Sequence, residues 1–185
     1  DTIPRIENVV GMTRAERAER VMVVGGGEIG LEVARRLERD GLDLAIIEKD
    51  MSRCRELAAE LKDALVLCGD GTNRGTLVEE DVSGVDAFLA LTRSDEVNIM
   101  ACLLAKGQGA RRAMALIHRG DYLSAAQGVG VDVAVSPRRS AANYILAHVR
   151  SKQVYRVVQV ENGKAEILEV HVPGRSEEHT SDLQS

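Results

Sequence analysis

One stretch near the start of the chain, residues 20–30 (RVMVVGGGEIG), constrains the fold more than any other. Its four consecutive apolar residues, 21–24, are typical of a strand buried on both faces. Glycines follow in the order G-x-G-x-x-G, and an amphipathic helix is predicted directly after them. The apolar face of that helix is expected to hold Ile29, Val33, Ala34 and Leu37. A glycine pattern between a strand and a helix predicts a nucleotide-binding turn.

Each of the three glycines has a predicted role in that turn. Gly25 permits a tight bend, Gly27 leaves room for a pyrophosphate to approach the backbone, and Gly30 lets the helix pack close to the strand. The free N–H groups and the positive end of the helix then face the anion. The structural alternative is that the glycines only form a tight strand–helix turn.

A second predicted strand, residues 42–48, ends in the carboxylate of Glu48. This residue lies 18 positions after Gly30, close to the ~20 expected for an acid that binds ribose. A carboxylate there accepts hydrogen bonds from the ribose hydroxyls and repels a 2′-phosphate, which favours NAD over NADP. The nearby cations Lys49 and Arg53 weaken that preference.

The chain continues to alternate between strand and helix patterns. Strands are predicted over 64–68, 85–91, 113–117 and 131–135, and helices over 51–62, 73–80, 96–106 and 121–127. This order predicts an α/β fold with a doubly wound parallel Rossmann-like sheet. Ligands bind such sheets at the carboxyl ends of the strands, where the sequence places 25–30, Glu48, 69–72, 92–96 and His118-Arg119.

The helical periodicity also predicts which residues face the core. In 51–62 these are Cys54, Leu57, Ala58 and Leu61, and in 96–106 they are Ile99, Met100, Leu103 and Leu104. Either Asp50 or Ser52 is expected to cap the first of these helices, and either Ser94 or Asp95 the second.

Composition excludes several other classes of protein. With 44% hydrophobic content in 185 residues, the chain supports one core and part of a second. A net charge of −5 and 2% aromatic residues argue against nucleic-acid binding. Three widely spaced cysteines are typical of a reducing cytosol, not of a disulfide framework. No apolar run approaches the ~18 residues of a membrane span, and no signal peptide opens the chain.

Changes in composition and in the hydrophobic pattern divide the chain into four predicted parts. Residues 1–19 are expected to be a linker remnant with a short charged helix over 13–19, and 20–136 the nucleotide-binding domain. Residues 137–174 comprise a helix and then a hairpin turning at Asn162-Gly163, which we expect to be the incomplete start of a small β-containing domain. Residues 175–185 resemble a translated sequencing adapter and are expected to be a non-native tail, so that the natural protein continues further.

Several motifs together resemble one family. The segments VVGGGEIG, GDGT (69–72), LTRSDEVNIMACLLAK (91–106), IHRGDY (117–122) and VSP (135–137) are similar to those of the RCK (or KTN) domains that control potassium conductance. The likeness is strongest to the second of two tandem nucleotide-binding domains in regulators of Trk-type potassium uptake. It covers about residues 20–148, and T-x-x-D-E-x-N is its specific part.

This resemblance implies a cytoplasmic subunit, peripheral on the inner face of the cell membrane, that binds NAD or NADH; related domains also accept ATP or ADP. Family members form homo-oligomeric rings through these domains beneath a membrane potassium-translocating subunit, and nucleotide binding changes transport. By motif position, Glu48 would hold the ribose, Asp70 and Gly71 would lie near the adenosine half, and Thr92 and Arg93 would line the nicotinamide side. The pyrophosphate would lie against the glycine turn, formed by Gly25, Gly26, Gly27, Glu28, Ile29 and Gly30.

Plainer roles remain open for some of these residues. Asp70 is also suited to an Asx-turn and Thr92 to satisfying a strand end, while Asp95 and Glu96 are expected only to favour a helix dipole. Arg119 is either a phosphate ligand or a surface arginine.

Two rival functions also remain: an NAD-dependent oxidoreductase lacking its substrate domain, and an assembly module with a vestigial pocket. The chain has no Y-x-x-x-K, no P-loop and no zinc-ligand spacing. We therefore predict no catalytic residue and no metal ligand, and we expect His118 to be a rim residue.

Overall fold

The computed structural model describes residues 18–150, 154–160 and 165–170. They belong to two compact units, which meet in sequence between Ser136 and Pro137 and are described separately. The elements of the first unit are β1 (Arg20–Val24), α2 (Glu28–Arg39), β2 (Asp43–Glu48), α3 (Met51–Glu60), β3 (Leu65–Cys68), α4 (Arg74–Glu79), the 3-10 turn η1 (Val82–Gly84), β4 (Ala87–Ala90), α5 (Asp95–Gly107), β5 (Arg112–Leu116), α6 (Tyr122–Gly128) and β6 (Val133–Val135).

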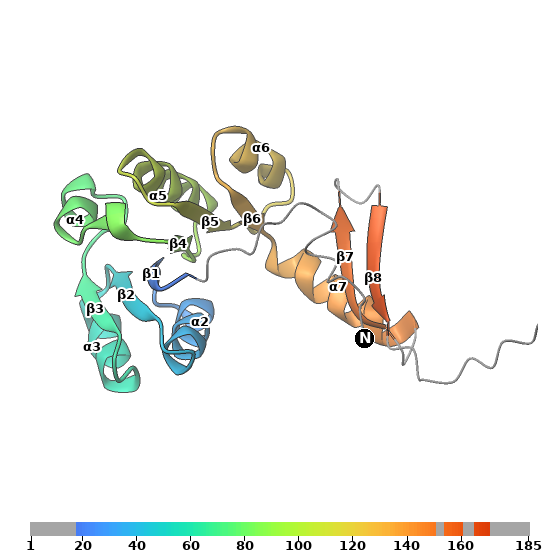
Figure 1. Ribbon diagram of the computed structural model, residues 1–185, viewed down its shortest axis with the longest axis horizontal. Coiled ribbons are helices and arrows are strands. Elements are labelled where there is room, and N and C mark those ends of the chain that lie inside the picture. Colours follow the sequence, from blue (N-terminus) through green and yellow to red (C-terminus); the bar gives the residue numbers. More distant parts are fainter. Residues whose placement is uncertain (1–17, 151–153, 161–164, 171–185) are drawn as a thin grey trace, which may run out of the picture. The chain divides into compact units, whose positions relative to one another are not determined.

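The six strands of this unit form one sheet in the order β3-β2-β1-β4-β5-β6 (Figure 1). Every neighbouring pair is parallel, and β1 lies between β2 and β4. The strand order therefore reverses beside β1, which is where doubly wound sheets bind their ligands. The predicted Rossmann-like fold is confirmed.

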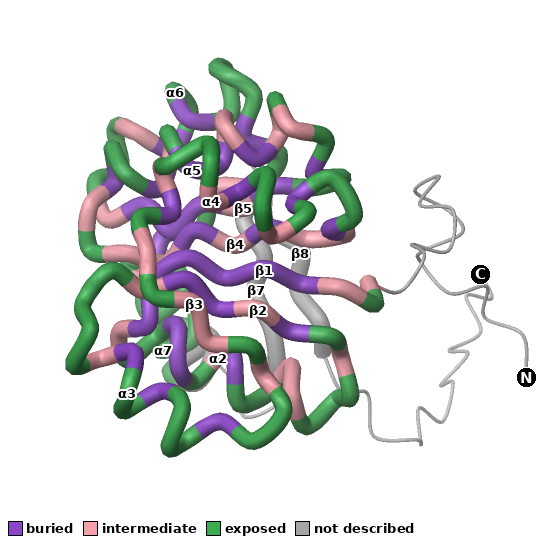
Figure 2. The backbone as a smooth tube through the Cα atoms, turned by 90° about the vertical axis from the view of Figure 1, so that its left-hand side faces the viewer, coloured by how far each residue is buried: buried purple, intermediate pink, exposed green. Residues whose placement is uncertain are grey.

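Helices cover both faces of the sheet. Helices α2 and α3 lie on one face, and α4, α5 and α6 on the other (Figure 1). Successive residues of β1 alternate between the two cores: Val21 and Val23 join the α2–α3 side, while Met22 and Val24 join the α4–α6 side. β1 is almost entirely buried (Figure 2), as the apolar run 21–24 predicted.

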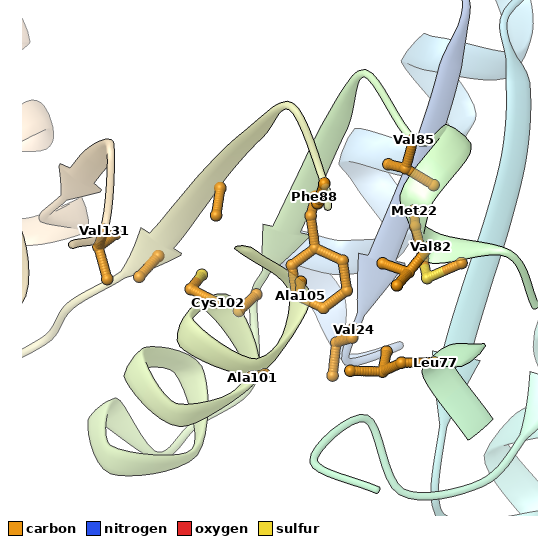
Figure 3. Close-up of a cluster of buried hydrophobic side chains, with 14 of the residues drawn as sticks. Met22, Val24, Leu77, Val82, Val85, Phe88, Ala101, Cys102, Ala105 and Val131 are labelled. Carbon is orange, nitrogen blue, oxygen red and sulfur yellow. The ribbon is translucent and has the colours of Figure 1, made fainter. Parts of the chain in front are cut away.

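The larger core depends on a narrow contact between α5 and the sheet. The buried stripe of α5 consists of small or medium residues at helical spacing, namely Asn98, Ala101, Cys102 and Ala105. Figure 3 shows the ring of Phe88 (β4) between Ala101, Cys102 and Ala105 of α5 and the side chains of Met22 and Val82. Small side chains on α5 let the helix approach closely enough to cover this ring.

Three predicted core positions are wrong. Met100 is 51% exposed and Ile29 is 41% exposed, and Ala58 is exposed as well. In α5 the buried face includes the polar Asn98. A prediction from hydrophobicity alone places Asn98 on the solvent side and so rotates the expected buried face. In α2 the contact with the sheet is made by Leu31 and Ala34 instead of Ile29.

Carboxylates accept hydrogen bonds from backbone amides at the amino-terminal ends of the strands. Asp86 accepts hydrogen bonds from the backbone N–H groups of Glu19 and Arg20 at 2.9 and 3.1 Å, and Asp132 accepts one from Ala113 at 2.7 Å. These side chains satisfy amides at strand starts, which would otherwise lack a partner in the sheet.

The second unit contains α7 (Pro137–Arg150), β7 (Val154–Val160) and β8 (Ala165–Val170). β7 and β8 pair antiparallel, which confirms the predicted helix and hairpin. The hairpin turn at 161–164, most of the predicted helix over 13–19 and the predicted tail at 175–185 lie outside the described residues.

Candidate functional site

A cavity of about 670 Å³ opens at the carboxyl ends of β1, β2, β3 and β4. Its volume falls in the range of ordinary small-molecule sites, ~300–1,000 Å³. The residues that line it are Val24, Gly25, Gly27, Glu28, Ile47, Glu48, Lys49, Asp50, Arg53, Gly69, Asp70, Gly71, Leu91, Thr92, Arg93, Ser94 and Val97.

The glycine turn forms one wall of this cavity. Gly25 has a φ of +102°, and a Cβ there would lie 2.9 Å from the backbone N of Thr92; only glycine fits this bend easily. A Cβ on Gly30 would collide with the carbonyl oxygen of Gly25, so the helix lies directly against the turn. At Gly27, in contrast, a Cβ would meet nothing within 4 Å. The absent side chain of Gly27 therefore leaves space next to the cavity.

The amino terminus of α2 differs from those of the next three helices. Asp50, Asn73 and Ser94 cap α3, α4 and α5 with their side chains, but Gly27 gives α2 no side-chain cap. The first N–H groups of a helix need partners outside the helix, and a bound anion is one such partner. Since Gly27 and Glu28 line the cavity, an anion in it would lie at the start of α2.

Glu48 is fixed at the edge of the cavity by two backbone amides. Its Oε2 accepts a hydrogen bond from Gly26 N at 2.7 Å, and its Oε1 accepts one from Asp50 N at 2.9 Å. A carboxylate oxygen can accept more than one hydrogen bond, so both oxygens retain capacity for ribose hydroxyls.

Arg53 holds the other side of the same residue, Gly26. Its Nε donates to the carbonyl oxygen of Gly26 at 2.6 Å, and its guanidinium pairs with Glu56 at 2.7 Å. Gly26 is thus held through its N–H by Glu48 and through its C=O by Arg53. The sequence named Arg53 only as a nearby cation, because a contact across 27 positions is not visible in local spacing.

Asp70 forms the Asx-turn that its sequence permitted. Its Oδ1 accepts hydrogen bonds from the hydroxyl and the amide of Thr72 at 2.7 and 2.8 Å, and these lower the pKa of Asp70. A Cβ on Gly71 would collide with the side chain of Val24, so this loop packs directly on the end of β1. Asp70 and Gly71 both line the cavity.

The buried side chain of Asn98 forms hydrogen bonds with the backbone just after β4. Its Oδ1 accepts from the amide and the hydroxyl of Thr92 at 2.9 and 2.6 Å. Its Nδ2 donates to the carbonyl oxygens of Thr92 and Leu116 at 3.0 and 2.8 Å. Asn98 thereby ties the end of β4 to the end of β5, and the hydroxyl of Thr92 serves this network.

Asp95, the first residue of α5, makes a second link, from the start of this helix to the residues that follow β5. It is only 4% exposed, and its carboxylate accepts from the backbone N–H groups of His118 and Arg119 at 2.8 and 2.9 Å. Nδ1 of His118 lies 2.9 Å from its Oδ1. Burial opposes ionisation of Asp95, but these hydrogen bonds outweigh it, so its pKa lies below the ordinary value. The predicted role of Asp95, an acid that only favours the helix dipole, is therefore incomplete.

Some of the predicted site residues line the cavity, and others do not. Those that line the cavity are Gly25, Gly27, Glu28, Glu48, Asp70, Gly71, Thr92 and Arg93. Gly26, Ile29 and Gly30 do not line it: Gly26 and Gly30 are buried in the turn, and Ile29 points to solvent. Arg119 pairs with Asp121 and lies over the ring of Tyr122, and neither Arg119 nor His118 reaches the cavity.

Comparison with known proteins decides the family, since residues 21–137 match the TrkA-N domain. The chain belongs to the TrkA-N domain family. It is 40% identical over 176 residues to the Trk system potassium uptake protein TrkA of Vibrio alginolyticus, covering 93% of this chain and 38% of that protein. It is also 37% identical to a TrkA homolog of Methanothermobacter thermautotrophicus over 152 residues, which are 82% of this chain and 70% of the homolog. The chain thus spans well under half the length of the Vibrio TrkA protein.

Solved structures share the fold at low sequence identity. The NAD(P)-binding domain of an exopolyphosphatase-related protein from Archaeoglobus fulgidus has a TM-score of 0.65 at 18% identity, over 72% of this chain and 98% of that one. The GsuK channel bound to NAD has a TM-score of 0.62 at 17% identity, over 85% of this chain and 29% of that one. Within the described residues of this TrkA-N chain, no helix has the length and apolarity needed to cross a membrane.

Proposed function

We propose that the cavity binds a dinucleotide, NAD or NADH, with ATP and ADP as competing adenine nucleotides. The observation that carries this proposal is the open space in front of Gly27, at the start of a helix that no side chain caps. A pyrophosphate needs this combination of room and free amides. Gly25–Gly30 would surround the pyrophosphate, Glu48 would accept from the ribose, and Asp70 and Gly71 would flank the adenosine half.

Thr92 and Arg93 would line the remaining side of the ligand. Both contribute to the cavity wall at the end of β4, on the other side of β1 from Glu48. The Thr92 hydroxyl is engaged with Asn98, so we expect Arg93 to make the larger contribution to affinity.

The role proposed for the whole protein is to regulate potassium uptake. The relatives named above are Trk system potassium uptake proteins, and the fold recurs in a channel solved with NAD and also with ADP. We therefore infer a cytoplasmic regulatory subunit, peripheral on the membrane, which forms homo-oligomers and gates a potassium-translocating membrane subunit according to its bound nucleotide. Residues 20–136 would be the sensing domain, and 137–174 the beginning of a further domain.

A thermal-shift titration tests the ligand. Saturating NADH, NAD, ADP and ATP are added separately, and the melting temperature is compared with the ligand-free protein. A ligand at about 100 times its Kd stabilises the folded state by about 2.7 kcal/mol, so the true ligand should raise the midpoint by several degrees. If none of the four raises it, the pocket is vestigial and the chain is an assembly module.

The enzyme alternative has a separate test. None of the residues that line the cavity is His, the side chain that most often transfers protons in catalysis, and none is Tyr or Cys. We expect no consumption of NADH with a panel of keto acids. Turnover with any of them would replace the regulatory function by an oxidoreductase function.

A further inference from the structure

Two of the three cysteines lie together behind the wall of the cavity. Cys54 is in the first turn of α3, and Cys68 is the last residue of β3. The strand register pairs Cys68 with Glu48. The alternation of side chains along β3 places Cys68 on the same face as Val66, which packs against the core beneath α2 and α3. Cys54 and Cys68 therefore face one another between α3 and β3.

A shared backbone atom brings the two segments close. The carbonyl oxygen of Glu48 accepts a hydrogen bond from Cys54 Sγ at 3.1 Å and another from Gly69 N at 2.9 Å. Gly69 directly follows Cys68, so the Cys54 sulfur lies beside the end of β3. The two thiols are close enough for Cys68 to contribute to the raised pKa of Cys54. Cys102, the third cysteine, lies on the buried face of α5, on the other side of the sheet.

The two thiols differ in their access to solvent. Cys68 is exposed, while Cys54 is buried. Burial raises the pKa of the Cys54 thiol to about 12, and Cys68, Glu48 and Asp50 add to this shift. A buried protonated thiol is a poor target for an oxidant in solution, so an oxidant meets Cys68 first.

We propose that Cys54 and Cys68 form a reversible disulfide when the protein meets a peroxide, and that this bond weakens nucleotide binding in the adjoining cavity. The Cys68 thiolate attacks hydrogen peroxide: an S–O bond forms, the O–O bond breaks, and hydroxide leaves. Cys54 then loses its proton, and its sulfur attacks the Cys68 sulfur. The S–S bond forms as the S–O bond breaks, and the two thiols and one peroxide become one disulfide and two waters.

The second part of the proposal rests on the proposed nucleotide function. A disulfide holds its sulfurs about 2.0 Å apart, closer than two thiols in contact, so the first turn of α3 must shift toward β3. Cys54 then no longer donates to the Glu48 carbonyl. This turn carries Asp50 and Arg53 into the cavity wall, and Gly69 and Asp70 follow Cys68 there. The shift therefore changes both sides of the wall near Glu48.

Peptide mapping under non-reducing conditions tests the bond in the full chain. After hydrogen peroxide and alkylation of the remaining thiols, we expect the Cys54 and Cys68 peptides to be joined and Cys102 to be alkylated, with dithiothreitol reversing the link. Cys102→Ala should form the same disulfide and Cys68→Ser none. A Cys68 oxidised only to sulfenic or sulfinic acid, or joined to a second chain, would overturn the proposal, because it shows that Cys54 cannot reach it.

Calorimetric titration with NADH tests the effect on binding. We expect the oxidised protein to bind about fivefold more weakly than the reduced one, and Cys68→Ser to be insensitive to peroxide. Equal affinity of the reduced and disulfide-bonded forms would overturn the coupling. If even the reduced protein fails to bind NADH or another adenine nucleotide, the proposed function and the coupling both fail, while the peptide map still decides whether the disulfide forms.

Discussion

The two halves of the sheet end differently at the edge that carries the cavity. In the half made of β1, β2 and β3, the ends of β1 and β3 are followed by glycines, and α2 begins without a side-chain cap. In the half made of β4 and β5, the strand ends are bonded to two buried side chains, Asp95 and Asn98. The same architecture thus leaves the amides of one half, the open half, free for a ligand and bonds the strand ends of the other, the closed half, to the protein's own side chains, although residues 91–94 of the closed half also line the cavity.

This difference explains how one fold provides both free amides for a ligand and a rigid polar network beside them. Backbone amides bind an anion only if no side chain already occupies them, and glycine leaves them accessible. A buried polar network with every group satisfied is rigid, but it is costly to disturb. Variants of Asp95 or Asn98 should therefore lose stability, whereas variants of residues that line the cavity should lose binding.

The largest effect is expected in the closed half, from Asp95→Ala. The amides of His118 and Arg119 would lose their acceptor, and buried groups left unpaired cost ~1–3 kcal/mol each, so the free energy of unfolding should fall by about 3 kcal/mol. Urea unfolding at pH 7 measures the change. The matched control is Asp121→Ala, which removes an exposed partner of Arg119 and should leave the free energy of unfolding nearly unchanged. Equal losses in both variants would show that the β4–β5 link is not important.

The next largest effect is expected in the open half, from Gly27→Val. The new side chain has space in the free protein, so stability should change by less than about 1 kcal/mol. It would occupy the space proposed for the pyrophosphate, and affinity for NADH should fall at least about tenfold, or 1.4 kcal/mol. Gly107→Val at the end of α5 also meets nothing within 4 Å and should bind normally. Unchanged affinity in Gly27→Val would place the nucleotide elsewhere.

How far the sequence predicts each half depends on the distance between interacting residues. In the open half, the glycine turn and the Asx-turn of Asp70 are local, and Glu48 follows from the usual spacing of the motif, but the contacts of Glu48 and Arg53 with Gly26 span 22 and 27 positions. The closed half depends on pairs such as Asn98 with Leu116 and Asp95 with His118, which are 18 and 23 positions apart. These pairs exist only because β5 lies beside β4, and no local pattern shows that a polar residue such as Asn98 is buried.

A smaller loss of affinity is expected from Glu48→Gln, which tests whether this carboxylate of the open half binds the ribose. Glutamine keeps the shape and can still accept from Gly26 N, but its NH₂ group cannot accept from Asp50 N or from a ribose hydroxyl. Affinity for NAD should fall about fivefold, corresponding to one hydrogen bond of ~1 kcal/mol, and the preference for NAD over NADP should decrease. Parallel titrations with NAD and NADP measure both changes. If the ratio of the two affinities stays the same, Glu48 does not contact the ribose.

The smallest effect concerns the opposite edge of the open half, where Glu38 closes the sheet. Its Oε1 accepts from the amides of Lys62, Asp63 and Ala64 at 2.8, 2.6 and 3.1 Å. The Asp63 amide above all, with those of Ala64 and Lys62, lowers the pKa of Glu38. A lowered pKa means that its contribution to stability is complete above the ordinary value of about 4.3 and is lost as the pH falls through the folded-state pKa.

The free energy of unfolding of Glu38→Gln should therefore be about 1 kcal/mol lower than that of the parent at pH 7. This difference should shrink as the pH falls below about 4.3. Urea unfolding of both proteins across this range measures it. Glu32→Gln on the solvent side of α2 is the control, since Glu32 pairs only with the exposed Arg36 among the described residues. A pH-independent difference for Glu38→Gln would mean that the three amides recognise the shape of the side chain and not its charge.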